Sequence, residues 1–203
     1  MPYLGNQHIV GDSVRNFKVL DDISSHTATF DGSSASVVST SDNTIRIINH
    51  RFVQGQRVVY SNGGGGNING LTANAYYIIK DSPHTFKLAA NESDAASLTP
   101  INLTSVGTGS SHTLRVSFDG VNKKFKATHS SGNKTHIHHA TQLSVSINNV
   151  PQRPNDNLTF TEGFAVENKS IIVFKQAPIP TDIFFGSAFG ETLGTFDISD
   201  LAI

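Results

Sequence analysis

The stretch from Thr141 to Asp197 constrains the fold more than any other part of the chain. Residues 143–147 (LSVSI) alternate between apolar and polar side chains, which is the pattern of a β-strand with one buried face. The pair Asn148–Asn149 follows, and asparagine tolerates the positive φ of a tight turn. Pro151 and Pro154 come next, and prolines are confined to sheet edges because they lack an N–H donor. The stretch predicts a small antiparallel β module.

The same stretch holds more apolar residues than a small sandwich needs. Residues 158–160 and 164–166 are predicted as short strands, whereas residues 170–174 (SIIVF) and 183–189 (IFFGSAF) are apolar on both faces. Such a surplus indicates either a subunit interface or a very central strand, and we expect the interface. The candidate interface residues are Ile172, Phe174, Phe184, Phe185 and Phe189.

Composition narrows the class of protein. The 203 residues suffice for one large or two small domains, and 17 glycines without any long 3.6-residue periodicity favour an all-β fold rich in turns. Charged residues make up 15% with a formal net charge of −1, so no nucleic-acid partner is expected. The absence of cysteine excludes disulfides and cysteine-based metal sites. No apolar run is long enough for a membrane span, and Met1 does not begin a signal peptide.

A first β domain is predicted between residues 31 and 116. Ala75–Lys80 and Thr85–Ala89 have high β propensity and are joined by four turn-forming residues, which predicts a hairpin. The four consecutive glycines at 63–66 have no side chains to pack and predict a loop. Further strands are expected at 44–47, 56–60 and 112–116.

The predicted organisation is two small antiparallel β-sandwich or barrel-like domains with an extended N-terminal arm. The arm covers residues 1–30, the first β domain 31–116 and the second β module 117–203. The arm either packs on a partner subunit or is a loosely ordered terminus.

Two runs of the second module resemble a module found near the N-termini of phage tail fibres, especially in phages of marine cyanobacteria. They are residues 143–160 (LSVSINNVPQRPNDNLTF) and residues 170–199, which contain FKQAPIPTDIFFG and end in FDIS. The family pattern is a strand with an "NGV.Q.P" turn, a strand pair, an "F..AP" to "D.FFG" stretch and a "FDI" exit. Asn149 replaces the glycine of the turn, and asparagine also adopts the left-handed conformation.

Upstream residues resemble the same family. Phe17–Ile23 (FKVLDDI) is similar to its leading "F..LDDI", and residues 117–125 are similar to its first strand, "tFnGs" followed by "tF". Separately, residues 50–89 resemble a repeat unit of phage tail and baseplate proteins, "H.F..G..VVYSNGG" followed by "YYI" and "TFKLA".

A near-repeat suggests how the two domains are joined. Residues 27–32 (TATFDG) recur approximately at 115–120 (RVSFDG), and about ninety residues separate LDDI from Phe118, although the two motifs are close in the family. We hypothesise that residues 33–116 are inserted within the fibre module, since domain termini often lie close together. The alternative is two tandem domains. The insertion requires contacts between residues 16–30 and 117–198.

Two histidines are the sharpest candidate for chemistry. His136 and His138 lie on one face if residues 135–139 are extended, and imidazoles bind transition metals. On a three-fold axis, this pair would supply six nitrogens to one ion. The alternative is a solvated polar segment, which we expect, because two histidines are too few for a closed site within one chain. No metal or cofactor is therefore assigned.

Enzymatic alternatives are weak. Gly11–Val14 (GDSV) is similar to the first block of an esterase family with Ser13 as nucleophile, but no histidine follows His139 to act as the base. The glycines at 63–66 lack the Lys-Ser or Lys-Thr of a phosphate loop. No spacing pairs carboxylates as in a glycosidase; the acids considered are Asp156, Glu162, Glu167 and Asp182. We assign no catalytic residue and expect no enzyme.

The resemblance implies a phage virion structural protein. It would be a tail fibre or fibre-attachment component that docks on the tail, neck or baseplate and assembles with copies of itself, most simply as a homotrimer. The expected partners are other virion proteins, with no nucleic acid or membrane, and any contact with a host receptor would be indirect. One alternative is a capsid decoration or vertex protein on the capsid surface. Another is a glycan-binding fibre tip, which the absence of tryptophan disfavours.

Overall fold

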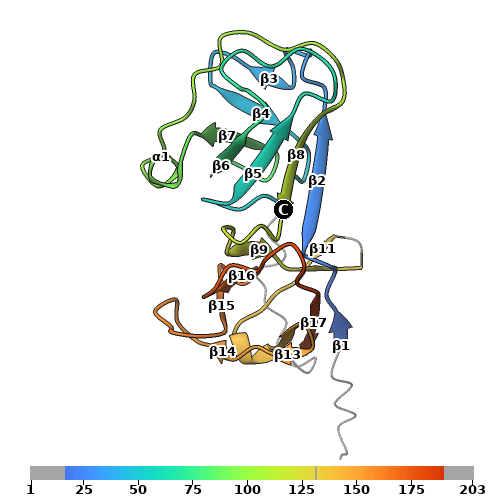
Figure 1. Ribbon diagram of the computed structural model, residues 1–203, viewed down its shortest axis with the longest axis vertical. Coiled ribbons are helices and arrows are strands. Elements are labelled where there is room, and N and C mark those ends of the chain that lie inside the picture. Colours follow the sequence, from blue (N-terminus) through green and yellow to red (C-terminus); the bar gives the residue numbers. More distant parts are fainter. Residues whose placement is uncertain (1–16, 131, 190–203) are drawn as a thin grey trace, which may run out of the picture.

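The computed structural model describes residues 17–130 and 132–189. Of these described residues, 41% are in strands and 5% in helices, which confirms the predicted all-β class. The strands form two lobes that follow one another along the longest axis of the molecule (Figure 1). We call residues 25–117 the upper lobe, and residues 17–24 together with 118–189 the lower lobe.

The upper lobe is a seven-stranded antiparallel sheet that curls into a half-barrel. Its strand order is β2-β8-β5-β6-β7-β4-β3, so the first and the last strands of the lobe are neighbours at one edge. The strands are β2 (Ser25–Phe30), β3 (Val38–Ser39), β4 (Thr44–Arg46), β5 (Arg57–Ser61), β6 (Ala75–Lys80), β7 (Thr85–Ala89) and β8 (His112–Ser117).

Alternation along these strands builds the core of the upper lobe. Val58 and Tyr60 of β5, Ile78 of β6 and Leu114 of β8 are all fully buried. Burial of each such side chain contributes about 1.5–3 kcal/mol relative to exposure. One concave face of the curled sheet is thereby filled with side chains, as in other small barrels.

The predicted hairpin is confirmed. β6 and β7 pair with Tyr77 opposite Ala89 and Lys80 opposite Phe86, and Ser82 organises the connection by accepting the His84 backbone N–H at 3.0 Å. The short helix α1 (Glu92–Ala96) follows and packs on β6 and β7. Its N-cap is Asn91, whose side chain accepts the Asp94 N–H at 2.9 Å.

The lower lobe contains two four-stranded sheets whose apolar faces share one core with the upper lobe. The first has the order β1-β17-β12-β13: β1 (Phe17–Val19), β17 (Phe184–Phe189), β12 (Leu143–Ile147) and β13 (Val150–Pro151). The second has the order β14-β15-β16-β9: β14 (Pro154–Asn155), β15 (Phe164–Glu167), β16 (Ile171–Phe174) and β9 (Lys124–Lys126). A two-stranded ribbon, β10 (Thr128–His129) and β11 (Asn133–Lys134), and a 3-10 turn, η1 (Ala140–Gln142), complete the lobe.

The turn and edge predictions for the lower lobe are confirmed. Asn148 and Asn149 both have positive φ, at 52° and 64°, and they connect β12 to β13 as a hairpin. Pro151 lies in β13 and Pro154 in β14, and each strand is at the edge of its sheet, where a missing N–H donor breaks no ladder. The strand predicted at residues 158–160 is wrong. Only Phe160 of these residues is buried, and the segment is irregular.

The chain passes between the lobes twice, on neighbouring strands. β1 pairs with β17, with Phe17 opposite Phe189, and the Asp21 N–H then donates to the Thr128 carbonyl at 2.8 Å. β2 continues into the upper lobe beside β8, which returns the chain to the lower lobe (Figure 1). The contacts that the insertion hypothesis requires are therefore present. Residues 17–30 form strands of both lobes rather than a separate arm, and residues 1–16 lie outside the described residues.

The two copies of the near-repeat lie on β2 and β8, the strands on which the chain passes between the lobes, and on the turns that follow them. Residues 27–32 and 115–120 begin on the paired strands β2 and β8 and run in opposite directions. The phenylalanine of each stretch is buried in a different lobe, Phe30 in the upper and Phe118 in the lower. The aspartate that follows each phenylalanine accepts a backbone N–H two residues later, at 2.9 Å in both cases, so each stretch ends in the same kind of turn.

Candidate functional site

The junction between the lobes is the most elaborate polar region of the structure. Gln56 is 2% exposed and donates from Nε2 to the Lys124 carbonyl at 2.8 Å. Asn122 donates to the Arg57 carbonyl at 3.2 Å, and the Arg57 guanidinium forms an ion pair with the Asp119 carboxylate. These bonds join β5 and its preceding loop to the lower lobe. Because buried polar groups need partners, they fix how the two lobes meet.

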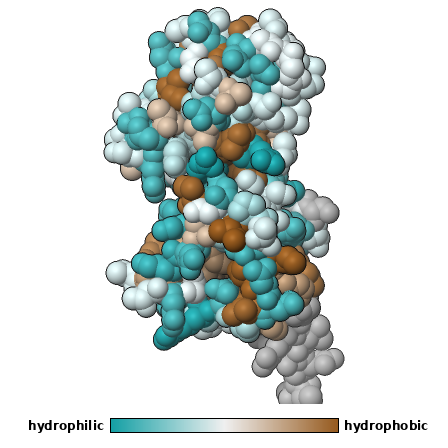
Figure 2. All heavy atoms as spheres, viewed as in Figure 1, coloured by the Kyte–Doolittle hydropathy of each residue, from teal (hydrophilic) through white to brown (hydrophobic). Residues whose placement is uncertain are grey.

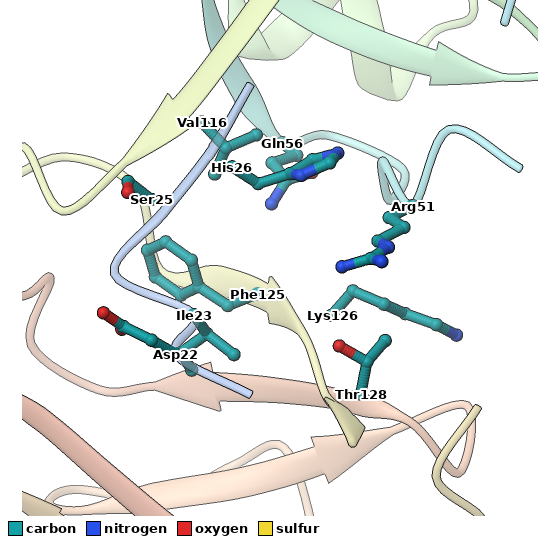
Figure 3. A pocket seen from close by; sticks show the side chains of 10 residues that line it. All are labelled: Asp22, Ile23, Ser25, His26, Arg51, Gln56, Val116, Phe125, Lys126 and Thr128. Atoms are coloured by element: carbon teal, nitrogen blue, oxygen red, sulfur yellow. The ribbon is translucent and has the colours of Figure 1, made fainter. Parts of the chain in front are cut away.

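A small cavity of about 50 Å³ opens at this junction, and we call it the interlobe pocket. Its walls come from both lobes and from both passages between them (Figure 3). The lining residues are Asp22, Ile23, Ser25, His26, Arg51, Gln56, Val116, Phe125, Lys126 and Thr128.

The loop between β4 and β5 places Arg51 in the pocket. Asn49 and Arg51 both have left-handed backbone conformations, with φ of 53° and 56°, and this conformation is unfavourable for a residue such as arginine. It directs the Arg51 side chain onto Gly132 of the lower lobe, where a Cβ atom would lie 1.8 Å from the guanidinium Nη2. Glycine at 132 is therefore required for this close approach between the lobes.

His50 anchors the same loop from inside the upper lobe. The residue is 2% exposed and its ring lies 4.9 Å from the Phe86 ring, centroid to centroid, at a steep angle. Nε2 donates to the Ser82 carbonyl at 3.0 Å, and Nδ1 accepts the Phe52 N–H at 3.1 Å. Both bonds require the neutral ring. Burial lowers the pKa of His50 below its ordinary value, and the nearby positive charge of Lys80 acts in the same direction.

His26 is the least satisfied polar group of the pocket. Its Nε2 is buried and has no hydrogen-bond partner within the described part of the chain. Burial lowers the pKa of His26, the charge of Arg51 lowers it further, and the His50 backbone opposes the shift. A buried nitrogen without a partner costs about 1–3 kcal/mol.

The two acidic residues beside the pocket have defined tasks. The Asp21 carboxylate accepts the Thr128 hydroxyl and the Gly132 N–H, both at 2.7 Å. The Asp22 carboxylate accepts the Ser24 N–H at 2.8 Å. Both aspartates belong to the LDDI motif, which therefore organises the lower edge of the junction.

The pocket provides donors rather than reactive groups. Among residues 17–130 and 132–189, no group of three or more His, Asp or Glu side chains is placed to hold a metal ion. Three of the four carboxylates considered for glycosidase chemistry have partners of their own: Glu162 pairs with Arg153, Glu167 with Lys124, and Asp182 accepts the Asn148 amide. The esterase-like residues 11–14 lie outside the described residues.

The candidate interface residues divide into two groups. Ile172, Phe174 and Phe184 are 0%, 3% and 9% exposed and belong to the core. Ile172 and Phe174 are apolar because they belong to a central strand, which was the alternative to a subunit interface. Their strand β16 lies between β15 and β9 and is buried by its own lobe. These three side chains are therefore not available to a partner. Phe185 and Phe189 are 52% and 38% exposed, and an interface through them stays a prediction.

Exposed apolar side chains collect on the lower lobe. Figure 2 shows several of them around its surface and near the narrowing between the lobes. They include Val19, Val121, Val150, Ile179 and Ile183 in addition to the two phenylalanines. A shallow depression of about 260 Å³ adjoins them, lined in part by Ile179, Pro178 and Phe174. Exposed apolar surface of this kind is typical of docking sites.

His136 and His138 lie side by side on the surface. Their ring centroids are 5.8 Å apart, both side chains are exposed, and the residues that alternate with them, Thr135 and Ile137, are buried. The two rings are thus on one face, as an extended segment requires. A metal site built from this pair stays a hypothesis that needs additional ligands.

Searches with the chain against protein-family models, curated proteins and solved structures gave no match. In the described residues, no helix is both long and apolar enough to cross a membrane.

The sequence analysis did not predict the interlobe pocket. The residues around Arg51 and His26 carry no local motif, because the pocket forms from segments that are distant in the chain.

Proposed function

We propose that the protein is a phage virion structural component, a tail fibre or fibre-attachment protein that docks on another part of the virion. One observation carries the proposal. The runs that resemble the fibre module begin at residues 17–23 and resume about ninety residues later, and residues 17–23 and 118–189 belong to a single lobe. β1 pairs with β17, and the Leu20 N–H donates to the Gly186 carbonyl at 2.9 Å.

The surface of the lower lobe supports a docking role. In the β1-β17-β12-β13 sheet, Val19 of β1 and Phe185 and Phe189 of β17 are exposed. Phe184 and Ala188, which adjoin the two phenylalanines in β17, are buried. Burying the exposed side chains against a partner is the usual source of association energy. The upper lobe then projects from the attachment region as a separate β unit.

Immunogold electron microscopy tests the proposal. Antibodies against the chain are applied to virus particles from lysates that contain it, and label on the tail, neck or baseplate is the expected result. Label over the capsid would contradict a tail-fibre role and would favour the alternative, a capsid decoration protein. A chain that never sediments with particles would refute a virion role of either kind.

A further inference from the structure

Burial alternates along residues 135–138, the segment that connects β11 to η1. Thr135 and Ile137 are 4% and 1% exposed, whereas His136 and His138 are both exposed. Side chains of an extended chain point alternately to two sides, so the burial of Thr135 and Ile137 turns the two imidazoles outward together. The rings are neighbours on the surface, with their centroids 5.8 Å apart.

Backbone hydrogen bonds fix the segment that carries the pair. The Ile137 N–H, between the two histidines, donates to the Lys169 carbonyl at 2.8 Å. The His138 N–H donates to Oε1 of Gln142 at 2.6 Å. Because the backbone is already held, side-chain torsions alone are needed to bring both rings to one ligand. A site prepared in this way loses less entropy when it binds.

The ring nitrogens of the pair are not engaged by other parts of the fold. Among residues 17–130 and 132–189, neither ring makes a hydrogen bond or an ion pair, and each has the other as its aromatic contact. The buried histidines differ in this respect, because His50 and His112 each use both ring nitrogens in hydrogen bonds. A neutral imidazole with a free lone pair is a metal ligand.

The separation of the rings suits joint coordination of one ion. With Zn–N bonds of about 2.0–2.1 Å, two imidazoles on a tetrahedral ion have ring centroids roughly 5 Å apart. The observed 5.8 Å differs from this by a small rotation of the side chains, and exposed side chains change rotamer within nanoseconds. Imidazole suits zinc, copper and nickel, whereas magnesium and calcium prefer oxygen ligands.

We propose that His136 and His138 form a two-histidine chelate for one divalent transition-metal ion, such as Zn²⁺, Ni²⁺ or Cu²⁺. Among the described side chains, no third His, Asp or Glu is placed to join them, so water fills the remaining coordination positions. The site is open and binds more weakly than a closed four-ligand site. The inference does not depend on the proposed function, because residues 136–138 lie outside the runs that resemble the fibre module.

Isothermal titration calorimetry of the full chain with zinc chloride, in a buffer that does not bind metals, is the first test. We expect saturable binding of one ion per chain, reversal by EDTA, and no binding of magnesium chloride. His136→Gln and His138→Gln should each weaken zinc binding about tenfold or more, because each leaves a single protein ligand. Both side chains are exposed, so neither change should disturb the fold.

Two other exposed histidines provide matched controls. His84 belongs to the upper lobe, where its Nδ1 accepts the Asn49 N–H at 3.2 Å. His139 adjoins the pair, but its backbone is extended, with φ of −131° and ψ of 144°, so its side chain should point to the opposite side from that of His138. Zinc affinity should be unchanged in His84→Gln and in His139→Gln. A loss in His139→Gln as large as in the pair variants would overturn the two-histidine geometry.

NMR of the wild-type chain makes the test independent of any variant. As zinc is added, the ring signals of His136 and His138 should shift together along the calorimetric curve, while those of His84 stay in place. Absence of saturable zinc binding refutes the site. Saturable binding that shifts one ring of the pair without the other, or other histidines instead of the pair, also refutes it.

Discussion

The hydroxyl of Tyr60 donates a 2.8 Å hydrogen bond to Nδ1 of His112 in the core of the upper lobe. The direction is fixed because Nε2 of the same ring lies 3.1 Å from the Thr108 carbonyl, which can only accept. The Tyr60 oxygen accepts in turn from the Ile68 N–H at 3.2 Å. Both side chains are almost completely buried. The chain of bonds therefore ties two loops to β5 and β8.

Tyr60→Phe should lower the free energy of unfolding by about 1–3 kcal/mol, because it leaves His112 Nδ1 and the Ile68 N–H buried without a partner. Urea denaturation measures the loss. Tyr77→Phe is the matched control, since no hydrogen bond to the Tyr77 hydroxyl occurs within the described residues. An unchanged midpoint for Tyr60→Phe would mean that water replaces the lost hydroxyl.

Gly32→Ala should be destabilising by about 1–3 kcal/mol through overpacking. A Cβ atom at Gly32 would lie 2.4 Å from the His112 ring, and the ring is held by bonds at both nitrogens. Gly55→Ala separates this effect from backbone strain. Gly55 has a φ of 74° and open space around its Cβ position, so only the conformational cost of about 1 kcal/mol applies there. Thermal denaturation should rank Gly32→Ala as the less stable variant.

The stability of the chain should depend on pH through His50. The folded-state pKa of His50 is lowered by burial, so the unfolded chain binds the extra proton at its ordinary pKa of 6.5. The contribution of neutral His50 to the free energy of unfolding is therefore fully present above about pH 6.5, and it is lost as the pH falls below that value. Protonation of Nδ1 would also break the bond from the Phe52 N–H. His26 adds to the loss in the same direction.

Melting temperatures across the acidic range check this prediction. The slope of melting temperature against pH should become shallower in His50→Gln, and it should be unaffected in His136→Gln, because His136 is exposed. Equal slopes in the wild type and in His50→Gln would assign the acid sensitivity to other groups.

Phe185→Ser should reduce self-association. Phe185 is 52% exposed, so its removal should spare the fold, while the lost apolar contact should weaken assembly about tenfold or more. Light scattering over a range of concentrations gives the mass. Ile48→Ser, at a 65% exposed site in the upper lobe, is the control. A wild-type chain that is monomeric at micromolar concentration contradicts the interface.

Local signals in the sequence predicted the strands and turns well. The alternation in residues 143–147 gave β12, the high β propensity of residues 75–80 gave β6, and the asparagine pair at 148–149 gave the hairpin turn. Each of these features depends on neighbours in the chain, where side-chain period and turn chemistry act directly. The strand predicted at residues 158–160 was wrong because three residues are too few to distinguish a strand from a loop.

Long-range placement was the part that the sequence could not supply. Residues 170–174 are apolar on both faces, and a central strand and a subunit interface give the same pattern, so the sequence could not decide between them for Ile172 and Phe174. Arg51 reaches the lower lobe only because its backbone is left-handed, and arginine carries no local preference for that conformation. The interlobe pocket therefore required the arrangement of the sheets to be known.

The pairing of Phe17 with Phe189 has a mechanical consequence. Tension applied between these two residues enters and leaves the protein at the same point, on adjacent strands. The force acts on the β1–β17 ladder, which it would peel one bond at a time, and it bypasses the upper lobe. That lobe can be carried by a stretched assembly without bearing any of its load.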